Sequence, residues 1–387
     1  MRSILFIMNY SVDHKSRRKY RDQMNAVKSL GCDVWYIGHD GRTIYLCHGD
    51  EKTAIGKVRC SLPLLPEENQ LYISIYRSIR EALKIKQDFT YCYVRRFIFE
   101  PAAADMLRLM HRSGIKTIVE IPTYPHHKEM LLQNTLKSRM LVAMDDFYAK
   151  KSAPSIDLFC PMGEEVKTLY GRPSLNIENG IDVSDIRLRV PVYQEKEYHI
   201  AALAVMTPWH GYDRLIRGLA DYYAVPDRED KIYLHLIGTG NVLEEWRQLA
   251  EKLGILEYVL FEGKMDNEQM NEAFDRYDMG AASLARYRSG LSVVYELKTR
   301  EYMARGIPFL YATEDRAIEQ FGKYALKVPN DDSPISMEGL LDFMKEMRGC
   351  PVAGQEMREY AARELTFEKQ FRKIFDFLDA EKKCEEI

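Results

Sequence analysis

The feature of this sequence that most constrains its fold is a regular alternation of two kinds of segment. Short apolar runs rich in β-branched and aromatic residues alternate with longer amphipathic segments along the 387 residues. Several of the short runs are continuously apolar, which is typical of strands covered on both faces. Strands separated by helices of this length predict right-handed crossovers and parallel sheets. The pattern therefore predicts an α/β protein built from doubly wound, Rossmann-like sheets.

The alternation occurs twice, on either side of a charged segment without clear periodicity, residues 182–198. The predicted strands are 4–10, 33–37, 91–94, 116–121, 158–161 and 175–178 in the first half, and 200–205, 232–237, 259–261, 280–284, 308–311 and 326–328 in the second. This predicts a first domain over 1–185, a second over 186–365 and a C-terminal helix within 366–387. That helix either packs on the second domain or crosses back to the first. Because such sheets bind ligands at the carboxyl ends of their strands, we expect the two domains to face each other across a cleft.

Charge and cysteine content exclude several classes of protein. The sequence has 55 Lys and Arg against 58 Asp and Glu, a net charge of −3, which argues against a mainly electrostatic binder of nucleic acid. The seven cysteines are scattered and never form C-x-x-C, which favours a reducing compartment and offers no zinc site. We therefore expect a cytoplasmic protein. Peripheral contact with an inner membrane stays open, with residues 77–86 beside Tyr72 and Tyr76 as the candidate surface.

The stretch 290–308 is the most informative part of the second half. It follows a predicted strand and predicts a helix that opens in the region of 292–296. Amide groups at a helix start, with Lys298 and Arg300 close by, suit a diphosphate. Glu301, one or two turns into the helix, could accept hydrogen bonds from two ribose hydroxyls. The alternative interpretation is a solvent-exposed helix whose acids and bases pair at helical spacing.

Five short patches, one at the end of the first domain and four in the second, carry a resemblance to a known family. They are residues 179–182 (NGID), 209–216 (WHGYDRLI), 237–240 (IGTG), 259–263 (VLFEG) and 301–308 (EYMARGIP). In order and spacing they are similar to the N-G-I-D, K-G-x-D-x-L-I, I-G-x-G, V-x-F-x-G and E-x-M-A-x-G-x-P motifs of the two-domain GT-B glycosyltransferases. The group they resemble is the retaining one called family 4 or group 1. In the first half the resemblance is mainly architectural.

The resemblance implies transfer of a sugar from a nucleotide diphosphate donor, a UDP- or GDP-sugar, to a hydroxyl of a carbohydrate or lipid-linked acceptor. It implies retention at the anomeric carbon, a role in cell-surface polysaccharide or glycolipid synthesis, and donor binding by the second domain. Positive potential placed in advance would stabilise the departing diphosphate. The family generally needs no metal, and we expect neither a metal nor another cofactor. Accordingly, Asp145 and Asp146 are interpreted as an acidic helix surface.

The sequence departs from the family pattern at two places. The first acid of the family's pair of glutamates falls on Val293, with Glu296 nearby at a different spacing. The family's Arg and Lys in the first loop of the second domain correspond to Val205 and His210. We expect His210 to act at the reacting centre, by donating a hydrogen bond or carrying a charge near an anion. The remaining residues of the expected nucleotide-sugar site are Glu301, Lys298, Arg300, Arg286, Arg288, Ser292, Glu296 and Gly238.

A polar cluster follows a predicted strand of the first domain at residues 120–127. We expect Glu120 and His126 to orient a substrate hydroxyl or the donor sugar, as catalytic residues. The expected acceptor-side residues are Arg95, Tyr124 and His14. The adjacent His126 and His127 also invite a metal interpretation, but neighbouring residues of an extended segment point apart and no third ligand is evident. The sequence therefore predicts no metal site here.

Two other functions remain open from the sequence. One is a catalytically degenerate subunit of the same fold, which binds or scaffolds rather than transfers, because the first acid and the usual basic pair are missing. The weaker one is a nucleotide-sugar epimerase built on the same two-domain architecture.

Overall fold

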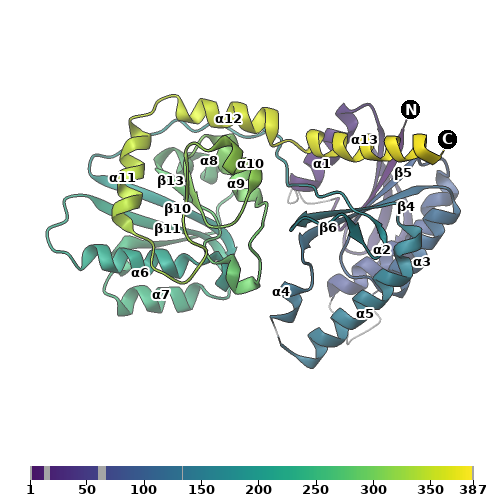
Figure 1. Cartoon of the computed structure of the whole chain (residues 1–387), viewed down its shortest axis with the longest axis horizontal. Helices are drawn as coiled ribbons and strands as arrows, with labels where there is room; N and C mark the ends of the chain where they lie inside the picture. Colours follow the sequence, from purple (N-terminus) through teal and green to yellow (C-terminus); the bar gives the residue numbers. More distant parts are fainter. Residues whose placement is uncertain (1, 13–17, 60–66, 133, 386–387) are drawn as a thin grey trace. The chain divides into compact units, whose positions relative to one another are not determined.

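The computed structural model of the chain describes residues 2–12, 18–59, 67–132 and 134–385, so the predicted His14 lies outside the described residues. The chain divides into two compact units. Unit 1 combines Met1–Gly180 with Phe367–Ile387, and unit 2 is Ile181–Thr366. Each unit is a sheet with helices packed on its faces (Figure 1). A search of the described helices finds none with the length and hydrophobicity of a membrane span.

The sheet of unit 1 has the strand order β4-β3-β2-β1-β5-β6-β7. Five strands run parallel, and the chain order reverses between β1 and β5. They are β1 (Ser3–Ile7), β2 (Asp33–His39), β5 (Tyr91–Arg95), β6 (Lys116–Tyr124) and β7 (Leu158–Gly163). The helices of this unit are α1 (Arg18–Ser29), α2 (Glu67–Ile85), α3 (Pro101–Arg112), α4 (Lys128–Leu131), α5 (Leu136–Ser152) and α13 (Phe367–Glu385).

Two strands at one edge of this sheet correct the expectation of a purely parallel sheet. β3 (Thr43–His48) and β4 (Glu51–Lys57) pair antiparallel with β2 and with each other. Only Gly49 and Asp50 connect them, and a connection of two residues permits a hairpin but no parallel crossover. A further small hairpin is formed by β8 (Thr168–Leu169) and β9 (Arg172–Pro173).

Strand β1 shows how the core of unit 1 is built. All five residues of β1 are buried, because the strand is apolar on both faces. On one face, Leu5 and Ile7 belong to the core cluster that includes residues of α2 and α3. On the other, Phe6 lies 5.9 Å from Phe371 of α13, measured between ring centroids. The sheet is therefore covered on both sides, as its continuous apolar strands predict.

Unit 2 has a six-stranded, fully parallel sheet in the order β12-β11-β10-β13-β14-β15. The strands are β10 (Glu197–Met206), β11 (Lys231–Gly240), β12 (Val259–Gly263), β13 (Met279–Ala281), β14 (Phe309–Tyr311) and β15 (Ala325–Lys327). The helices are α6 (Tyr212–Tyr223), α7 (Leu243–Lys252), α8 (Asn267–Arg276), α9 (Leu297–Arg305), α10 (Arg316–Phe321), α11 (Met337–Arg348) and α12 (Ala353–Glu364). All six strands predicted for this half are found, with shifted bounds.

The predicted strand at 175–178 is wrong. Residues of this segment run beside β7, with hydrogen bonds from the Leu175 N–H to the Phe159 carbonyl (2.9 Å) and from the Ile177 N–H to the Pro161 carbonyl (3.0 Å). The segment forms no strand ladder, however, and leads out of unit 1 toward residue 181.

Candidate functional site

The carboxyl ends of β10 and β13 lie next to each other where the strand order of unit 2 reverses. The loops that follow them pack together, and the Leu284 N–H donates to the His210 carbonyl at 2.9 Å. Gly211 between these loops has φ 67°, and a Cβ there would lie 2.7 Å from the Ala285 Cβ. Only glycine fits this contact. The two loops therefore form one surface at the position where open α/β sheets bind their ligands.

His210 on this surface is neutral and has a defined tautomer. The Thr207 N–H donates to its Nδ1 at 3.1 Å, so Nδ1 is an acceptor and the proton resides on Nε2. Burial, together with the charges of Lys298 and Arg286, lowers the pKa of His210 to about 2. Of the two expected roles of His210, the charged one is therefore corrected, because the neutral ring offers only the Nε2 hydrogen as a donor.

Lys298 and Glu296 lie at the start of α9, beside the end of β13. The Lys298 Nζ is 3.1 Å from the Tyr212 hydroxyl and 3.6 Å from the Glu296 carboxylate. Burial lowers the pKa of Lys298, although Glu296 opposes this shift. The Glu296 carboxylate accepts from the Ser283 N–H at 3.1 Å and so ties the start of α9 to the loop after β13.

The helix begins at Leu297, later than predicted. Glu296 is the N-cap residue with extended backbone angles, φ −74° and ψ 139°. Ser292 lies in an exposed loop, and its carbonyl accepts from the Glu314 N–H at 2.8 Å. The predicted role of Ser292 at the helix start is therefore corrected. The amide groups at the start of α9 belong to residues from Leu297 onward.

Arg286 completes a small cationic group at this surface. Its buried guanidinium lies 5.7 Å from the centre of the Trp209 ring. Arg286 and Lys298 are cations, Glu296 is an anion and His210 is neutral, so these four groups carry one net positive charge. Fixed positive potential of this kind stabilises an anion that binds or develops beside it.

Two of the predicted ligand-binding arginines serve the fold instead. Arg288 donates two hydrogen bonds to Asp213 (2.8 and 2.9 Å) and also pairs with Asp332. Arg300 has no exposed surface and pairs with the buried Asp315. Their partners lie far away in sequence, 75 residues for Asp213 and 15 for Asp315, so spacing alone could not reveal the pairs.

Glu301 and Gly238 have clear positions within unit 2. The side chain of Glu301 is 25% exposed and accepts a hydrogen bond from the Arg305 Nε at 2.9 Å, one helical turn away. Its role toward ribose stays a prediction. Gly238 lies within β11, where a Cβ would lie 2.0 Å from the Ala204 carbonyl oxygen of β10. The missing side chain of Gly238 is thus required by the pairing of β10 with β11.

Glu120 of unit 1 is a structural residue, which corrects its prediction as a catalytic one. It is fully buried, and four side chains donate to its two oxygens: Lys19 (3.1 Å), Gln23 (2.6 Å), Tyr93 (2.6 Å) and Arg95. Burial alone would raise the pKa of Glu120, but the charges of Lys19 and Arg95 outweigh it and bring the pKa to about 2. No lone pair is left to orient a substrate hydroxyl.

Arg95 keeps partial access to solvent, with 21% of its side chain exposed, while it pairs with Glu120. Tyr124, at the end of β6, is half-buried and precedes Pro125 in a cis peptide bond. Whether these two residues contact an acceptor stays a prediction.

The histidines after β6 and Asp145 of α5 overturn two expectations. His126 and His127 do not point apart, because both rings approach the Asp145 carboxylate, at 3.6 and 2.6 Å. Asp145 is fully buried rather than on an acidic surface. These three side chains form a group that could hold a metal ion. The same carboxylate, however, pairs with Arg96, and a guanidinium in that place competes with a cation.

The neighbours of His126 define its protonation state. Burial and the charge of Arg96 lower the pKa of His126 to about 3. Its Nδ1 is buried without a hydrogen-bond partner among the described residues, and its Nε2 is 3.5 Å from the Tyr170 hydroxyl. His126 is therefore a neutral ring with an unused polar atom.

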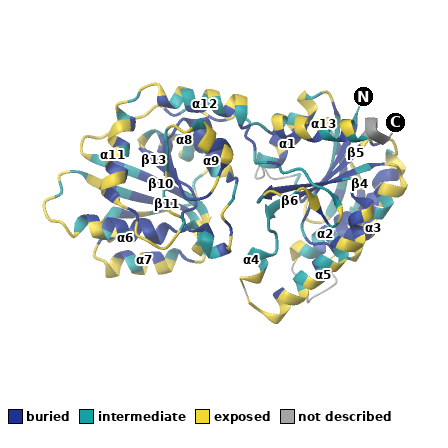
Figure 2. Cartoon of the chain, in the orientation of Figure 1, coloured by how far each residue is buried: buried dark blue, intermediate teal, exposed yellow. Residues whose placement is uncertain are grey.

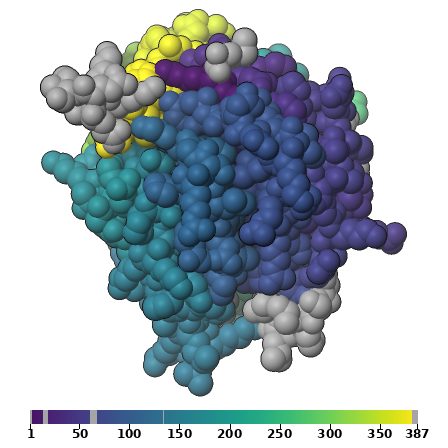
Figure 3. Space-filling view, turned by 90° about the vertical axis from the view of Figure 1, so that its right-hand side faces the viewer, coloured from purple at the N-terminus to yellow at the C-terminus, as the bar shows by residue number. Residues whose placement is uncertain are grey.

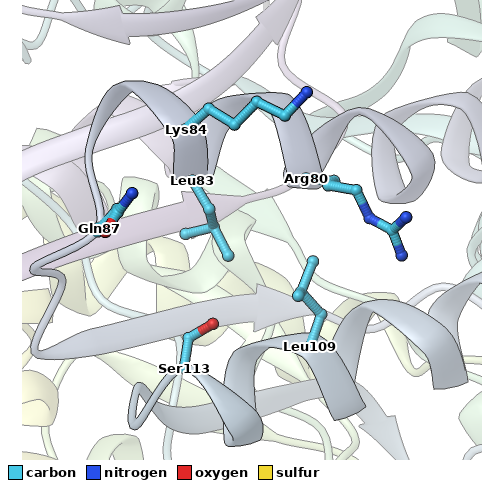
Figure 4. Close-up of a pocket in the computed structure, with 6 residues that line it drawn as sticks. All are labelled: Arg80, Leu83, Lys84, Gln87, Leu109 and Ser113. Atoms are coloured by element: carbon cyan, nitrogen blue, oxygen red, sulfur yellow. The ribbon is translucent and has the colours of Figure 1, made fainter.

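A surface cavity of about 350 Å³ lies between α2 and α3 (Figure 4). Leu83 and Leu109 point toward each other across it, and the chain ends of both helices, at Gln87 and Ser113, close it on one side. These helix ends precede β5 and β6, so the cavity lies at the amino ends of the strands. Nucleotide sites of open α/β sheets lie at the opposite edge.

The structure is similar to solved glycosyltransferases over nearly its whole length. Sucrose-phosphate synthase of Thermosynechococcus elongatus superimposes with a TM-score of 0.63 at 14% identity, covering 98% of this chain and 100% of that one. HepE of Anabaena, solved in complex with UDP, gives 0.59 at 12% identity, covering 98% and 100%. WaaG, a glycosyltransferase involved in lipopolysaccharide biosynthesis, gives 0.57 at 14% identity, covering 96% and 99%.

No family model matches the sequence. No curated protein matches it either. The chain shares with these glycosyltransferases an architecture of two α/β units, with a parallel sheet of Rossmann order in unit 2, over nearly the whole length of each structure. The chain has the GT-B fold, the fold of the glycosyltransferases that its sequence motifs resemble.

Proposed function

We propose that the protein is a retaining glycosyltransferase that moves a sugar from a nucleotide diphosphate donor to a hydroxyl acceptor, in the assembly of a cell-surface polysaccharide or glycolipid. The observation that carries this proposal is the cationic group of unit 2. A half-buried Lys298, a buried Arg286 and the Nε2 hydrogen of His210 meet at the switch point of a Rossmann sheet, beside the start of α9. Such a surface suits a diphosphate.

The reaction exchanges one bond at the anomeric carbon for another. The bond from this carbon to the diphosphate oxygen breaks, and a bond to the acceptor oxygen forms on the same face of the sugar. The acceptor proton passes to a phosphate oxygen of the leaving nucleoside diphosphate. Lys298, Arg286 and the amides of α9 would hold the charge that develops on the diphosphate, and the His210 Nε2 hydrogen would add a directed donor. Glu301 would accept hydrogen bonds from the ribose.

Nucleotide binding and transfer test the proposal separately. We expect UDP or GDP to raise the melting temperature of the purified chain. Glu301→Ala, which removes a charged acceptor, should weaken that binding about tenfold or more. Lys323→Ala is a matched control, because Lys323 is a 59% exposed cation that pairs with Glu356 elsewhere in unit 2. If none of UDP, GDP and ADP stabilises the chain, the proposal fails.

The assignment of retention is tested by NMR of the product formed from an α-linked donor, which should again be α-linked. A β-linked product would contradict the mechanism while leaving the transferase activity intact. Isomerised donor without any acceptor would instead identify an epimerase.

A degenerate binding subunit is the second candidate, and a specific observation favours it. Arg288 and Arg300 both form internal ion pairs, so carboxylates of the chain already balance two of the four expected cations. A chain that is stabilised by a nucleotide but neither transfers nor hydrolyses any nucleotide sugar would support this candidate over an enzyme.

A further inference from the structure

Tyr212, the first residue of α6, links three elements of the candidate site in unit 2. Its side chain is fully buried, and its hydroxyl donates to the carbonyl of Ala281, the last residue of β13, at 3.2 Å. The same hydroxyl accepts from the Lys298 Nζ of α9 at 3.1 Å. In Figure 2 the central strands β10, β11 and β13 are coloured mainly as buried. The hydroxyl therefore lies between a buried strand end and a half-buried cation.

The position and the direction of this hydroxyl are both fixed. The Tyr212 ring meets the Trp246 ring edge-on, with 5.7 Å between the ring centroids, and lies 5.7 Å from the His210 ring. A tyrosine hydroxyl has one hydrogen, which here goes to the Ala281 carbonyl. Toward Lys298 the oxygen can therefore only accept. Packing holds the ring in place without the hydroxyl, so the hydroxyl can be removed while the packing is kept.

The Lys298 ammonium lies between the Tyr212 hydroxyl and the Glu296 carboxylate. Its Nζ is 3.6 Å from the carboxylate oxygen, which is longer than a hydrogen bond. An ammonium has three N–H donors, and 14% of the Lys298 side chain is exposed, so an N–H remains for a ligand. Lysine carries its charge on a flexible four-carbon stem. Without the Tyr212 hydroxyl, nothing described here would keep this charge from closing on Glu296.

We propose that Tyr212 is a positioning residue, whose hydroxyl holds the Lys298 ammonium away from Glu296 and ready for the diphosphate of the donor. This inference rests on the proposed function. A cation stabilises a diphosphate most effectively when it is fixed before the ligand arrives, because no free energy is then spent on moving it. Tyr212 thus acts through Lys298 and has no contact of its own with the nucleotide.

Two other buried tyrosines, Tyr72 and Tyr76 of α2, contribute to packing instead. They are each only 4% exposed, and the Tyr72 ring stacks on that of Phe97 at 4.5 Å. Figure 3 shows the face of unit 1 where α2 and α3 lie, in blue. Both rings belong to the core of this unit. They therefore cannot supply the aromatic part of the membrane-facing surface considered from the sequence.

Isothermal titration of the full chain with UDP tests the inference, or with GDP or ADP if one of these stabilises the chain instead. Tyr212→Phe keeps the ring and removes the hydroxyl, and we expect it to bind the nucleotide about fivefold more weakly. Tyr302→Phe is the matched control, because Tyr302 is also fully buried and its hydroxyl donates to the same Ala281 carbonyl at 3.1 Å. It should bind as the wild type does, and both variants should melt at similar temperatures without nucleotide.

A double-mutant cycle with Lys298→Met separates positioning from a general effect on the fold. If Tyr212 acts through Lys298, Tyr212→Phe should cause no further loss of affinity in the Lys298→Met background. The same loss in both backgrounds, or no loss in the wild-type background, overturns the inference and leaves the proposed function intact. A wild-type chain that binds none of the three nucleotides refutes the proposed function, and this inference with it. The two failures are therefore distinguishable.

Discussion

His210 and Lys298 show how burial sets the chemistry of single residues in this chain. Both side chains are half-buried, and burial is the first cause of the lowered pKa of each. The lowered pKa has a different consequence for each residue. The neutral His210 remains a directed hydrogen-bond donor, whereas Glu296, 3.6 Å from the Lys298 Nζ, favours the charged form of Lys298. The two residues therefore contribute different interactions to the same surface: direction from His210 and charge from Lys298.

Substitution of His210 tests whether the Nε2 hydrogen is its functional atom. His210→Gln places an amide N–H near the former position of Nε2, so we expect it to retain most of the affinity for UDP. His210→Ala should lose about tenfold, the value of one hydrogen bond to a charged group. Isothermal titration of both variants with UDP measures the difference. Equal affinities of the two variants would assign His210 a role in loop packing only.

Substitution of Glu120 tests its structural role. Glu120→Gln leaves the half-buried Lys19 and Arg95 without their buried anion, and we expect a loss of about 3 kcal/mol in the free energy of unfolding at pH 7. Glu356→Gln, which changes an exposed carboxylate paired with Lys323, should have little effect and serves as the control. Urea denaturation monitored by circular dichroism measures both. Similar small losses in the two variants would restore Glu120 as a candidate catalytic residue.

Among the elements, α9 depends on the glycine that ends it. Gly306 has φ 68°, and a Cβ there would lie 2.6 Å from the Cα of Gly354 at the start of α12. We expect Gly306→Ala to cost about 3 kcal/mol, since it adds overpacking to a left-handed backbone. Gly322→Ala is the matched control, because Gly322 has φ 63° but open surroundings, and it should cost about 1 kcal/mol. Thermal unfolding compares them, and equal costs would contradict the packing argument.

The elements also show what periodicity can and cannot predict. Continuous apolar runs correctly predict the parallel strands of both sheets, because those strands are covered on both faces, whereas the run at 175–178 is wrongly predicted as a strand. The hairpin β3–β4 escapes prediction, since β4 is a mostly exposed edge strand without an apolar run. The expectation of Asp145 on a surface is wrong, because α5 buries Asp145 while large apolar residues of the same helix, such as Met140, are exposed. The positions of polar residues predict the exposed face of a helix only when those residues have no buried partners in other elements. Asp145 has such partners, Arg96 and His127.

For the whole molecule, one buried and two half-buried histidines predict a fall in stability at mildly acidic pH. The pKa is lowered to about 3 for His126, about 2 for His210 and about 4 for His235, by burial first in each case. In the unfolded chain these rings titrate near pH 6.5. Below that pH the unfolded state takes up protons that the folded state does not, so stability present above pH 6.5 is lost as the pH falls toward 4.

Three such groups lower the free energy of unfolding by up to about 4 kcal/mol per pH unit in that range. Urea denaturation at a series of pH values between 7.5 and 4.5 measures this slope. The triple variant His126→Gln, His210→Gln, His235→Gln should show a flatter profile. An unchanged slope in that variant would assign the acid sensitivity to other groups.

The site of unit 2 was predictable from the sequence only in part. The start of α9 with Lys298 and the loop with His210 both lie at the carboxyl edge of the sheet, because strand-to-helix connections of a parallel sheet begin at that edge. The functions of Arg288, Arg300 and Glu120 were not predictable. Each is fixed by a partner from a distant part of the chain, and such pairs exist only once the units are folded.

Because α13 belongs to unit 1, unit 2 is fully synthesised before unit 1 is. Unit 2 is one uninterrupted stretch, whereas unit 1 receives its last helix from the end of the chain. Phe371 of that helix lies 5.0 Å from the ring of Tyr93, and Phe375 lies 5.5 Å from Tyr91. The ribosome therefore completes all of unit 2 before it synthesises α13, the last helix of unit 1. Until α13 is synthesised, the face of the unit 1 sheet that includes Tyr91 and Tyr93 lacks its covering helix. We expect chaperones to bind this apolar face of the nascent chain.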